Sequence, residues 1–161
     1  MSEIIRVGMA DLKVCKCPDG LTTLGLGSCI GVAPRDPSTK VGGLLHFMLP
    51  DSTAIKNNTC AEKFADTGIE LLVKLMLAEG ASRSRLEAKI AGGAQMFAFQ
   101  NKEGLLRVGE RNAEAARNKL KEMNIKLIAE DTGADYGRTV VFYPETGEYI
   151  IKSVGKQKKS I

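Results

Sequence analysis

The sequence contains no tryptophan, and aromatic residues make up only 5% of its 161 residues. Proteins that bind single-stranded nucleic acid stack the bases on aromatic side chains, and this chain offers few of them. Its net charge of +4 is modest, and part of it lies in the terminal run Lys156, Lys158 and Lys159. Such a balance is compatible with an acidic protein partner. We therefore expect no nucleic-acid binding.

Long hydrophobic runs are also missing. No apolar stretch approaches the roughly 20 residues that a helix needs to cross a bilayer. The N-terminal segment MSEIIRVGMADLKV alternates apolar and polar residues and has no signal-peptide core. These absences predict a cytoplasmic protein without membrane insertion. In that compartment the four cysteines, Cys15, Cys17, Cys29 and Cys60, are expected to be reduced thiols.

The composition is that of an ordinary globular domain, with 43% apolar and 26% charged residues. The length fits one domain with a full hydrophobic core, and no linker or repeat divides the chain. We predict a single domain over residues 1–155. The basic C-terminal tail, residues 156–161, is predicted to be solvated and disordered.

Strand patterns dominate the chain, and two segments have helical periodicity. The first helix is expected to begin at a capping box of Thr59 and Glu62 and to end at Gly80. The second is expected to begin at Asn112 as N-cap and to run to Met123. This order predicts an α+β fold of mixed α/β layers, a strand-rich domain with a mixed or antiparallel sheet packed by two main helices. The strands are expected at 4–7, 12–15, 21–24, 29–34, 41–49, 86–91, 125–129, 138–143 and 149–154.

The chain has one histidine, His46, and Cys29 precedes it by 17 residues. The midpoint falls in the turn-prone segment 35–40. If 29–34 and 41–49 form a hairpin, Cys29 and His46 face each other with Cβ atoms roughly 4.5–5.5 Å apart. That distance suits a thiol and an imidazole that share a proton. A bulge in the turn would instead put them on opposite faces of the sheet.

The residues before Cys29 suit such a site. Gly25 and Gly27 allow a tight turn and a close approach to a substrate. Backbone N–H groups near Gly27, Ser28 and Cys29 can bind the oxyanion of a tetrahedral intermediate. Taken on their own, these glycines are equally compatible with a structural turn.

A nearby imidazolium is expected to lower the pKa of the Cys29 thiol toward neutrality. Thr22 or Thr23, on the preceding strand, can orient the second ring nitrogen of His46. The alternatives are structural: Cys29 as a small buried side chain and His46 as a core or surface residue.

Several segments, in order, resemble one family. These are Thr23-Leu24-Gly25-Leu26-Gly27-Ser28-Cys29, His46, Met48-Leu49-Pro50-Asp51-Ser52, Gly92-Gly93-Ala94-Gln95-Met96-Phe97, Gly109-Glu110-Arg111-Asn112, Asp131-Thr132-Gly133 and Gly137-Arg138-Thr139. They are similar to signatures of the CheD-type chemoreceptor glutamine deamidases. The resemblance spans residues from about 5 to 155.

This resemblance implies a cysteine hydrolase with a Cys–His–Thr triad. Cys29 would be the nucleophile, His46 the general base and acid, and Thr23 the residue that orients His46. Gly27 and Ser28 would contact the substrate. The implied reaction converts receptor glutamine side chains to glutamate, with glutamyl methyl esters as further substrates in some members. It implies neither a cofactor nor a metal.

The implied partners are the cytoplasmic domains of chemoreceptors and a CheC-type phosphatase, with the chain acting as a monomer or in a heterocomplex. The alternative function is a non-catalytic adaptor that binds and tunes that phosphatase. Asp131-Thr132-Gly133 also resembles the catalytic turn of retroviral-type aspartic proteases, but only 30 residues follow Asp131 and Glu130 stands where that fold needs an apolar residue. Of the other segments, Gly92-Gly93 is expected to form a bend, with Gln95 near the site as the alternative. Arg111-Asn112 is expected to start a helix, with a substrate clamp as the alternative, and Arg138 is expected to form an ion pair.

Overall fold

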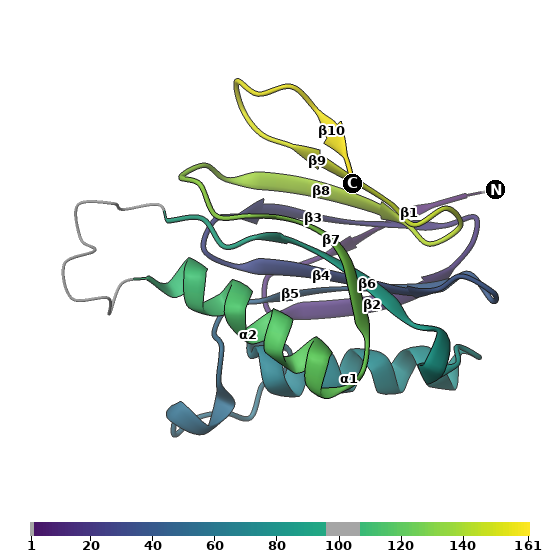
Figure 1. The fold of residues 1–161 in the computed structure, drawn as a ribbon, viewed down its shortest axis with the longest axis horizontal. Helices are drawn as coiled ribbons and strands as arrows, with labels where there is room; N and C mark the ends of the chain where they lie inside the picture. The colour runs from purple at the N-terminus through teal and green to yellow at the C-terminus, as the bar shows by residue number, and fades with distance from the viewer. Residues whose placement is uncertain (1, 96–106) are drawn as a thin grey trace.

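The computed structural model describes residues 2–95 and 107–161. Two five-stranded sheets face each other (Figure 1). The first has the order β1-β3-β8-β9-β10 and the second β2-β5-β4-β6-β7. The strands are β1 Ile4–Val7, β2 Asp11–Lys16, β3 Gly20–Leu26, β4 Ile30–Asp36, β5 Val41–Phe47, β6 Glu87–Gly92, β7 Lys126–Thr132, β8 Arg138–Tyr143, β9 Glu148–Lys152 and β10 Lys159–Ser160.

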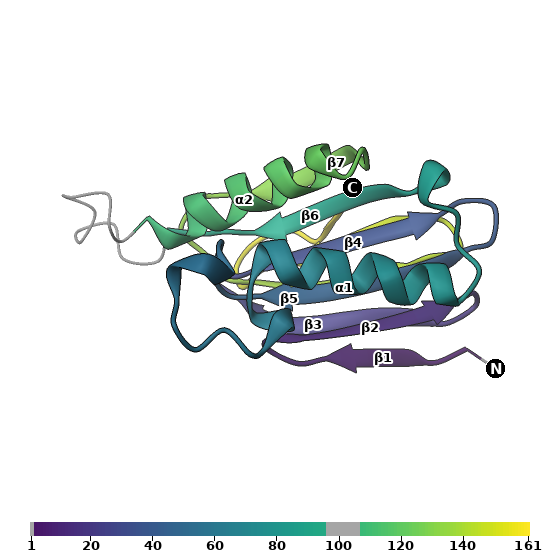
Figure 2. The same cartoon turned by 90° about the horizontal axis from the view of Figure 1, so that it is seen from below.

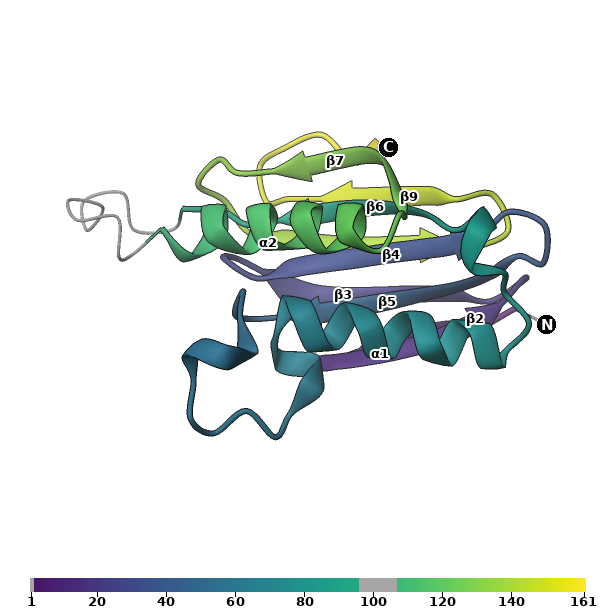
Figure 3. The ribbon, with the colours of Figure 1, turned by 60° about the horizontal axis from the view of Figure 1, so that its bottom comes forward.

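Both sheets are mixed. Strands β1 and β3 pair in parallel, as do β6 and β7, and the other pairs are antiparallel. The two main helices, α1 Ala65–Ala78 and α2 Val108–Glu122, lie side by side on one face of the second sheet (Figures 2 and 3). Short 3-10 turns occur at Ser52–Ala54, Ala61–Lys63 and Arg83–Arg85. The predicted fold class, strand-rich mixed α/β layers with two helices, is confirmed.

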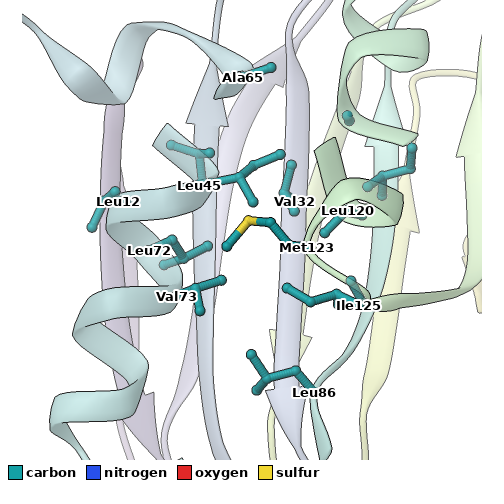
Figure 4. Close-up of a cluster of buried hydrophobic side chains, with 14 of the residues drawn as sticks. Leu12, Val32, Leu45, Ala65, Leu72, Val73, Leu86, Leu120, Met123 and Ile125 are labelled. Carbon is teal, nitrogen blue, oxygen red and sulfur yellow. The ribbon is translucent and has the colours of Figure 1, made fainter. Parts of the chain in front are cut away.

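The three layers enclose two cores. One lies between the helices and the second sheet, where Leu72 of α1 and Leu120 of α2 meet Val32 and Leu45 of the sheet (Figure 4). The other lies between the two sheets. Because successive strand residues point to opposite faces, Val32 and Leu45 face the helices while their neighbours face the first sheet. Every residue of β5 is buried, since both of its faces are covered.

Both helix starts differ from the prediction. Helix α1 begins at Ala65, and Thr59 and Glu62 precede it in an irregular segment and a 3-10 turn. Helix α2 begins at Val108, so Asn112 lies inside it and is not its N-cap. The predicted end of the first helix is confirmed: Gly80 has φ +105°, and Ala81 N–H donates to the Met76 carbonyl at 3.1 Å.

The β4–β5 hairpin also differs in register. His46 lies opposite Gly31, and Ile30 opposite Phe47, so Cys29 is two residues away from direct opposition. The loop between β4 and β5 is centred one residue later than the midpoint between Cys29 and His46, because Asp36 is the last residue of β4. Its carboxylate accepts from the Ser38 N–H at 2.8 Å, and its carbonyl accepts from the Lys40 N–H at 2.8 Å. A shift of two residues keeps Cys29 and His46 on the same face.

Residues 156–161 are exposed apart from the half-buried Ile161, but the end of this segment is paired, unlike the predicted disordered tail. Lys159 and Ser160 pair with Ile151 and Ile150 as β10, and the Lys159 ammonium donates to Asp131 at 2.8 Å. Among residues 2–95 and 107–161, no helix is long and apolar enough to span a bilayer.

Candidate active site

Of the three residues predicted to form a triad, Thr23 and His46 are hydrogen-bonded between the two sheets, and Cys29 lies between the same sheets without a hydrogen bond to His46. Thr23 lies on β3 of the first sheet, and His46 lies on β5 of the second. Cys29 lies in the turn just before β4 and belongs to the cluster of buried side chains between the sheets. Alternation along β4 and β5 sets this placement, since Gly31 and His46 are paired and face the first sheet. Thr23 and His46 are 0% and 1% exposed.

A chain of hydrogen bonds runs from Val7 through Thr23 to His46. Thr23 Oγ1 lies 2.8 Å from the Val7 carbonyl oxygen and 2.8 Å from His46 Nδ1. A carbonyl can only accept, so the single hydroxyl proton of Thr23 is donated to Val7. The Thr23 oxygen then accepts from Nδ1–H of His46. This network assigns the tautomer with its proton on Nδ1 and a lone pair on Nε2.

That Nε2 atom is buried and has no hydrogen-bond partner in the described part of the chain. Burial lowers the pKa of His46, because the protein interior disfavours the imidazolium. Asp11 lies opposite His46 on β2, but its carboxylate accepts from Lys13 Nζ at 2.9 Å and from Gly8 N–H at 3.1 Å. His46 is thus a neutral imidazole with a free basic nitrogen in the site.

Cys29 is 8% exposed, and burial raises the pKa of its thiol. The expectation that an imidazolium lowers this pKa is therefore wrong for the structure. The physical reason is that both groups are desolvated, which favours the neutral thiol together with the neutral imidazole. The resting site therefore holds a neutral thiol and a neutral imidazole rather than an ion pair.

Three successive carbonyl groups of the turn are held from one side. The Gly27 carbonyl accepts from Ala94 N–H at 2.9 Å, and the Cys29 carbonyl accepts from Gly93 N–H at 2.9 Å. Between them, the Ser28 carbonyl accepts from Asn112 Nδ2 at 2.9 Å. In a trans peptide the N–H points opposite to the C=O. The N–H groups of Ser28 and Cys29 therefore point away from these donors, and within residues 2–95 and 107–161 neither has an acceptor.

Glycines allow this close packing behind the turn. Gly92 has φ +112°, and a Cβ added to it would lie 2.2 Å from the Cys29 carbonyl oxygen. A Cβ on Gly109, in the first turn of α2, would lie 2.4 Å from the Ala94 carbonyl oxygen. The predicted bend at Gly92-Gly93 is confirmed, since both residues have positive φ. The adjoining Met96 and Phe97 lie outside the described residues.

Asn112 is the residue that sequence reasoning misplaced. Its side chain is fully buried, and its Nδ2 donates to both the Ser28 carbonyl and the Met48 carbonyl, at 2.9 and 2.8 Å. The signal was present, because Asn112 belongs to one of the segments similar to a known family. Its contact with the turn depends on the packing of α2, which no local pattern reveals.

Asp131 and Arg138 have structural roles. Arg138 is 2% exposed, and its Nε lies 3.0 Å from Asp131, which confirms the predicted ion pair. Desolvation raises the pKa of Asp131, but hydrogen bonds from Lys159 and Arg138 lower it by more. The net pKa lies below the ordinary value, so the carboxyl is ionised at neutral pH. Such a carboxylate is not a candidate protease acid. Within the described residues, no group of three His, Cys, Asp or Glu side chains is arranged to hold a metal ion.

Comparison with known proteins identifies the family of the chain. The family described as CheD, chemotactic sensory transduction, matches residues 48–153, which is more than half of the chain. The chain belongs to the CheD family. Thr23, Cys29 and His46 lie before the matched range, whereas Gly92, Gly93 and Asn112 lie within it.

Full-length relatives extend the CheD match over Thr23, Cys29 and His46. The chain is 60% identical over 161 residues to a protein of Lachnoclostridium phytofermentans, with 100% of both chains covered. It is 52% identical over 160 residues to one of Caldanaerobacter subterraneus, with 99% of each covered, and 50% identical over 161 residues, with 100% of each covered, to one of Syntrophomonas wolfei. All three relatives carry the name "Probable chemoreceptor glutamine deamidase CheD".

Proposed function

We propose that this CheD-family chain hydrolyses selected glutamine side-chain amides on the cytoplasmic helices of chemoreceptors. Cys29 is the nucleophile, His46 the general base and acid, and Thr23 the residue that orients His46. The observation that carries the proposal is the hydrogen bond between Thr23 and His46 Nδ1, which leaves a basic Nε2 on the face that holds Cys29. Its support in the comparisons is the shared name of the full-length relatives.

The reaction follows from the protonation states of the resting site. His46 Nε2 takes the Cys29 proton as sulfur attacks the amide carbonyl carbon. The carbonyl oxygen becomes an oxyanion, and the unpartnered N–H groups of Ser28 and Cys29 are placed to bind it. His46 then protonates the leaving nitrogen, so ammonia departs and a thioester remains. Water, activated by His46, hydrolyses the thioester to glutamate and the free thiol.

The same chemistry accepts a glutamyl methyl ester, because an ester carbonyl is attacked in the same way and methanol replaces ammonia as the leaving group. The sequence resemblance supports this second substrate class. Esters and amides compete for one Cys29, so both activities depend on the same nucleophile.

The decisive experiment incubates a folded chemoreceptor cytoplasmic fragment with the wild-type chain, Cys29→Ala and His46→Gln, followed by peptide mass spectrometry. We expect conversion of specific glutamines to glutamates by the wild type only. Cys60→Ala, which removes an exposed thiol, is the matched control and should retain activity. No conversion by the wild type would contradict the deamidase.

The sequence resemblance also supports a CheC-type phosphatase as a partner. If the chain is an adaptor alone, Cys29→Ala should bind and tune the phosphatase as the wild type does, and no variant should change receptor glutamines. Measuring phosphatase binding and receptor deamidation on the same preparations separates an adaptor from an enzyme that also has this partner.

A further inference from the structure

Asn112 joins the two segments that carry the thiol and the imidazole. Its Nδ2 lies 2.9 Å from the carbonyl oxygen of Ser28, the residue before Cys29. The same nitrogen lies 2.8 Å from the carbonyl oxygen of Met48, two residues after His46. Two N–H groups on one nitrogen thus hold two chain segments, and the side chain is fully buried.

The two hydrogen bonds from the Asn112 amide lie beyond the end of the β4–β5 ladder, where the sheet no longer joins the two segments. The last pair of the β4–β5 ladder at this end is Ile30 with Phe47, so Ser28 and Met48 lie beyond it. No ladder bond connects these two segments past that pair. The amide from α2 replaces the missing bond and sets the distance between the turn and the end of β5.

The two carbonyls also determine how the amide is oriented. Asn112 Oδ1 is buried and has no hydrogen-bond partner among residues 2–95 and 107–161. Rotating the amide by half a turn would place this oxygen against two carbonyl oxygens, which repel it. The side chain therefore leaves one acceptor unsatisfied while both donors are used. A helix N-cap or a simple space-filling residue would need neither donor.

We propose that Asn112 is a positioning residue for hydrolysis at Cys29. By holding the Ser28 carbonyl, it directs the Cys29 N–H the opposite way, toward the developing oxyanion. By holding Met48, it aligns the strand end that carries His46 with the turn that carries Cys29. It touches neither substrate nor reacting atoms in this role. The inference rests on the proposed function.

The test compares Asn112→Leu and Asn112→Asp with the wild type. Leucine has a similar volume and no donor, and aspartate has the shape of asparagine but presents acceptor oxygens to both carbonyls. Asn118→Leu, an exposed position on the same helix, is the matched control. Deamidation of a chemoreceptor cytoplasmic fragment gives kcat and KM, and hydrogen exchange gives the local stability of peptides covering 27–31 and 46–49.

We expect kcat of both Asn112 variants to fall about 10- to 100-fold with KM within about twofold, because small misplacements of reacting groups cost rates of this order. Exchange should accelerate in the two peptides and stay unchanged in β8 and β9. Wild-type kcat with wild-type exchange, or acceleration of exchange over the whole chain with activity falling only as the folded fraction falls, would overturn the proposal. If the wild-type chain deamidates nothing, the proposed function fails, and the exchange data still decide whether Asn112 clamps the two segments.

Discussion

The Thr23 hydroxyl and His46 Nδ1, 2.8 Å apart, connect the two sheets of the domain through one hydrogen bond. The same hydroxyl donates to the Val7 carbonyl on the neighbouring strand β1. Because Thr23 donates to Val7 and accepts from His46 Nδ1–H, the basic lone pair of His46 lies on Nε2. The state of the imidazole therefore depends on a backbone carbonyl that no substitution of a side chain removes.

Replacing Thr23 with valine should reduce kcat about 10- to 100-fold, since general acid–base catalysis is worth about 10²–10⁴ and a misoriented imidazole retains part of it. Thr23→Ser keeps the hydroxyl and should retain most of the activity. Thr22→Val is the matched control, because its hydroxyl donates to Val140 instead. Equal losses in the valine variants at 22 and 23 would show that the effect is structural. Steady-state deamidation of a receptor fragment measures all three.

The pH dependence of kcat/KM should be that of a site in which the Cys29 thiol and the His46 imidazole are both neutral in the free protein. Burial lowers the pKa of His46, so the base stays unprotonated below the ordinary histidine value of about 6.5, and activity should persist to lower pH. Burial raises the pKa of Cys29, so its alkylation by iodoacetamide should keep increasing above about pH 8.5. A plateau of alkylation from pH 6 to 8 would instead indicate a preformed thiolate–imidazolium pair.

Gly92→Ala should displace the carbonyl of Cys29 and reduce both stability and activity. The new Cβ would lie 2.2 Å from that oxygen, in addition to the strain of φ +112°. Gly80→Ala separates the two effects, because Gly80 has a similar φ of +105° with nothing within 4 Å. The control should cost about 1 kcal/mol of unfolding free energy and leave kcat unchanged. Equal stability and equal kcat for both variants would contradict the clash.

Asp36→Asn should destabilise the fold by about 1–2 kcal/mol at pH 7, because it removes the charge from a buried carboxylate that accepts two hydrogen bonds from the partly exposed Arg85. The Asp36 side chain is fully buried, and Arg85 donates to it at 3.0 and 2.8 Å. Those hydrogen bonds, outweighing desolvation, hold the pKa of Asp36 well below its ordinary value.

The effect of Asp36 on stability should depend on pH in one direction. A depressed pKa stabilises the fold above the unfolded value of about 3.9, and this contribution is lost as the pH falls below it. The difference between wild type and Asp36→Asn should therefore shrink in acid, as urea unfolding at pH 7 and pH 3 would measure. The exposed Asp135→Asn variant should show little effect at either pH. A difference that grows in acid would contradict the ion-pair account.

The strand-rich layered fold and the order of its elements could be predicted from the sequence. Apolar–polar alternation in some strands, apolar runs in others such as β5, and the 3.6-residue period of α1 and α2 are properties of the local sequence. Helix starts were less accurate. Thr59 and Glu62 have the residue types of a capping box, but Glu62 lies in the 3-10 turn Ala61–Lys63. The pairing of Leu49 with Phe64 then keeps Phe64 extended, so the helix begins at Ala65.

The sequence by itself also limited the chemistry, because a single histidine and the segment ending at Cys29 leave few ways to build a thiol hydrolase. The tertiary structure decided the rest. It shifted the register of the β4–β5 hairpin by two residues from the predicted one. It also selected Thr23 over Thr22 as the partner of His46 and placed Asn112 against Ser28 and Met48. The contacts of Thr23 and Asn112 depend on which elements pack together over long sequence separations, and local propensities contain no information about such contacts. The register depends on the hydrogen bonds that Asp36 makes in the turn. Protonation follows the same rule, since burial between two sheets, rather than residue type, keeps both the thiol and the imidazole neutral.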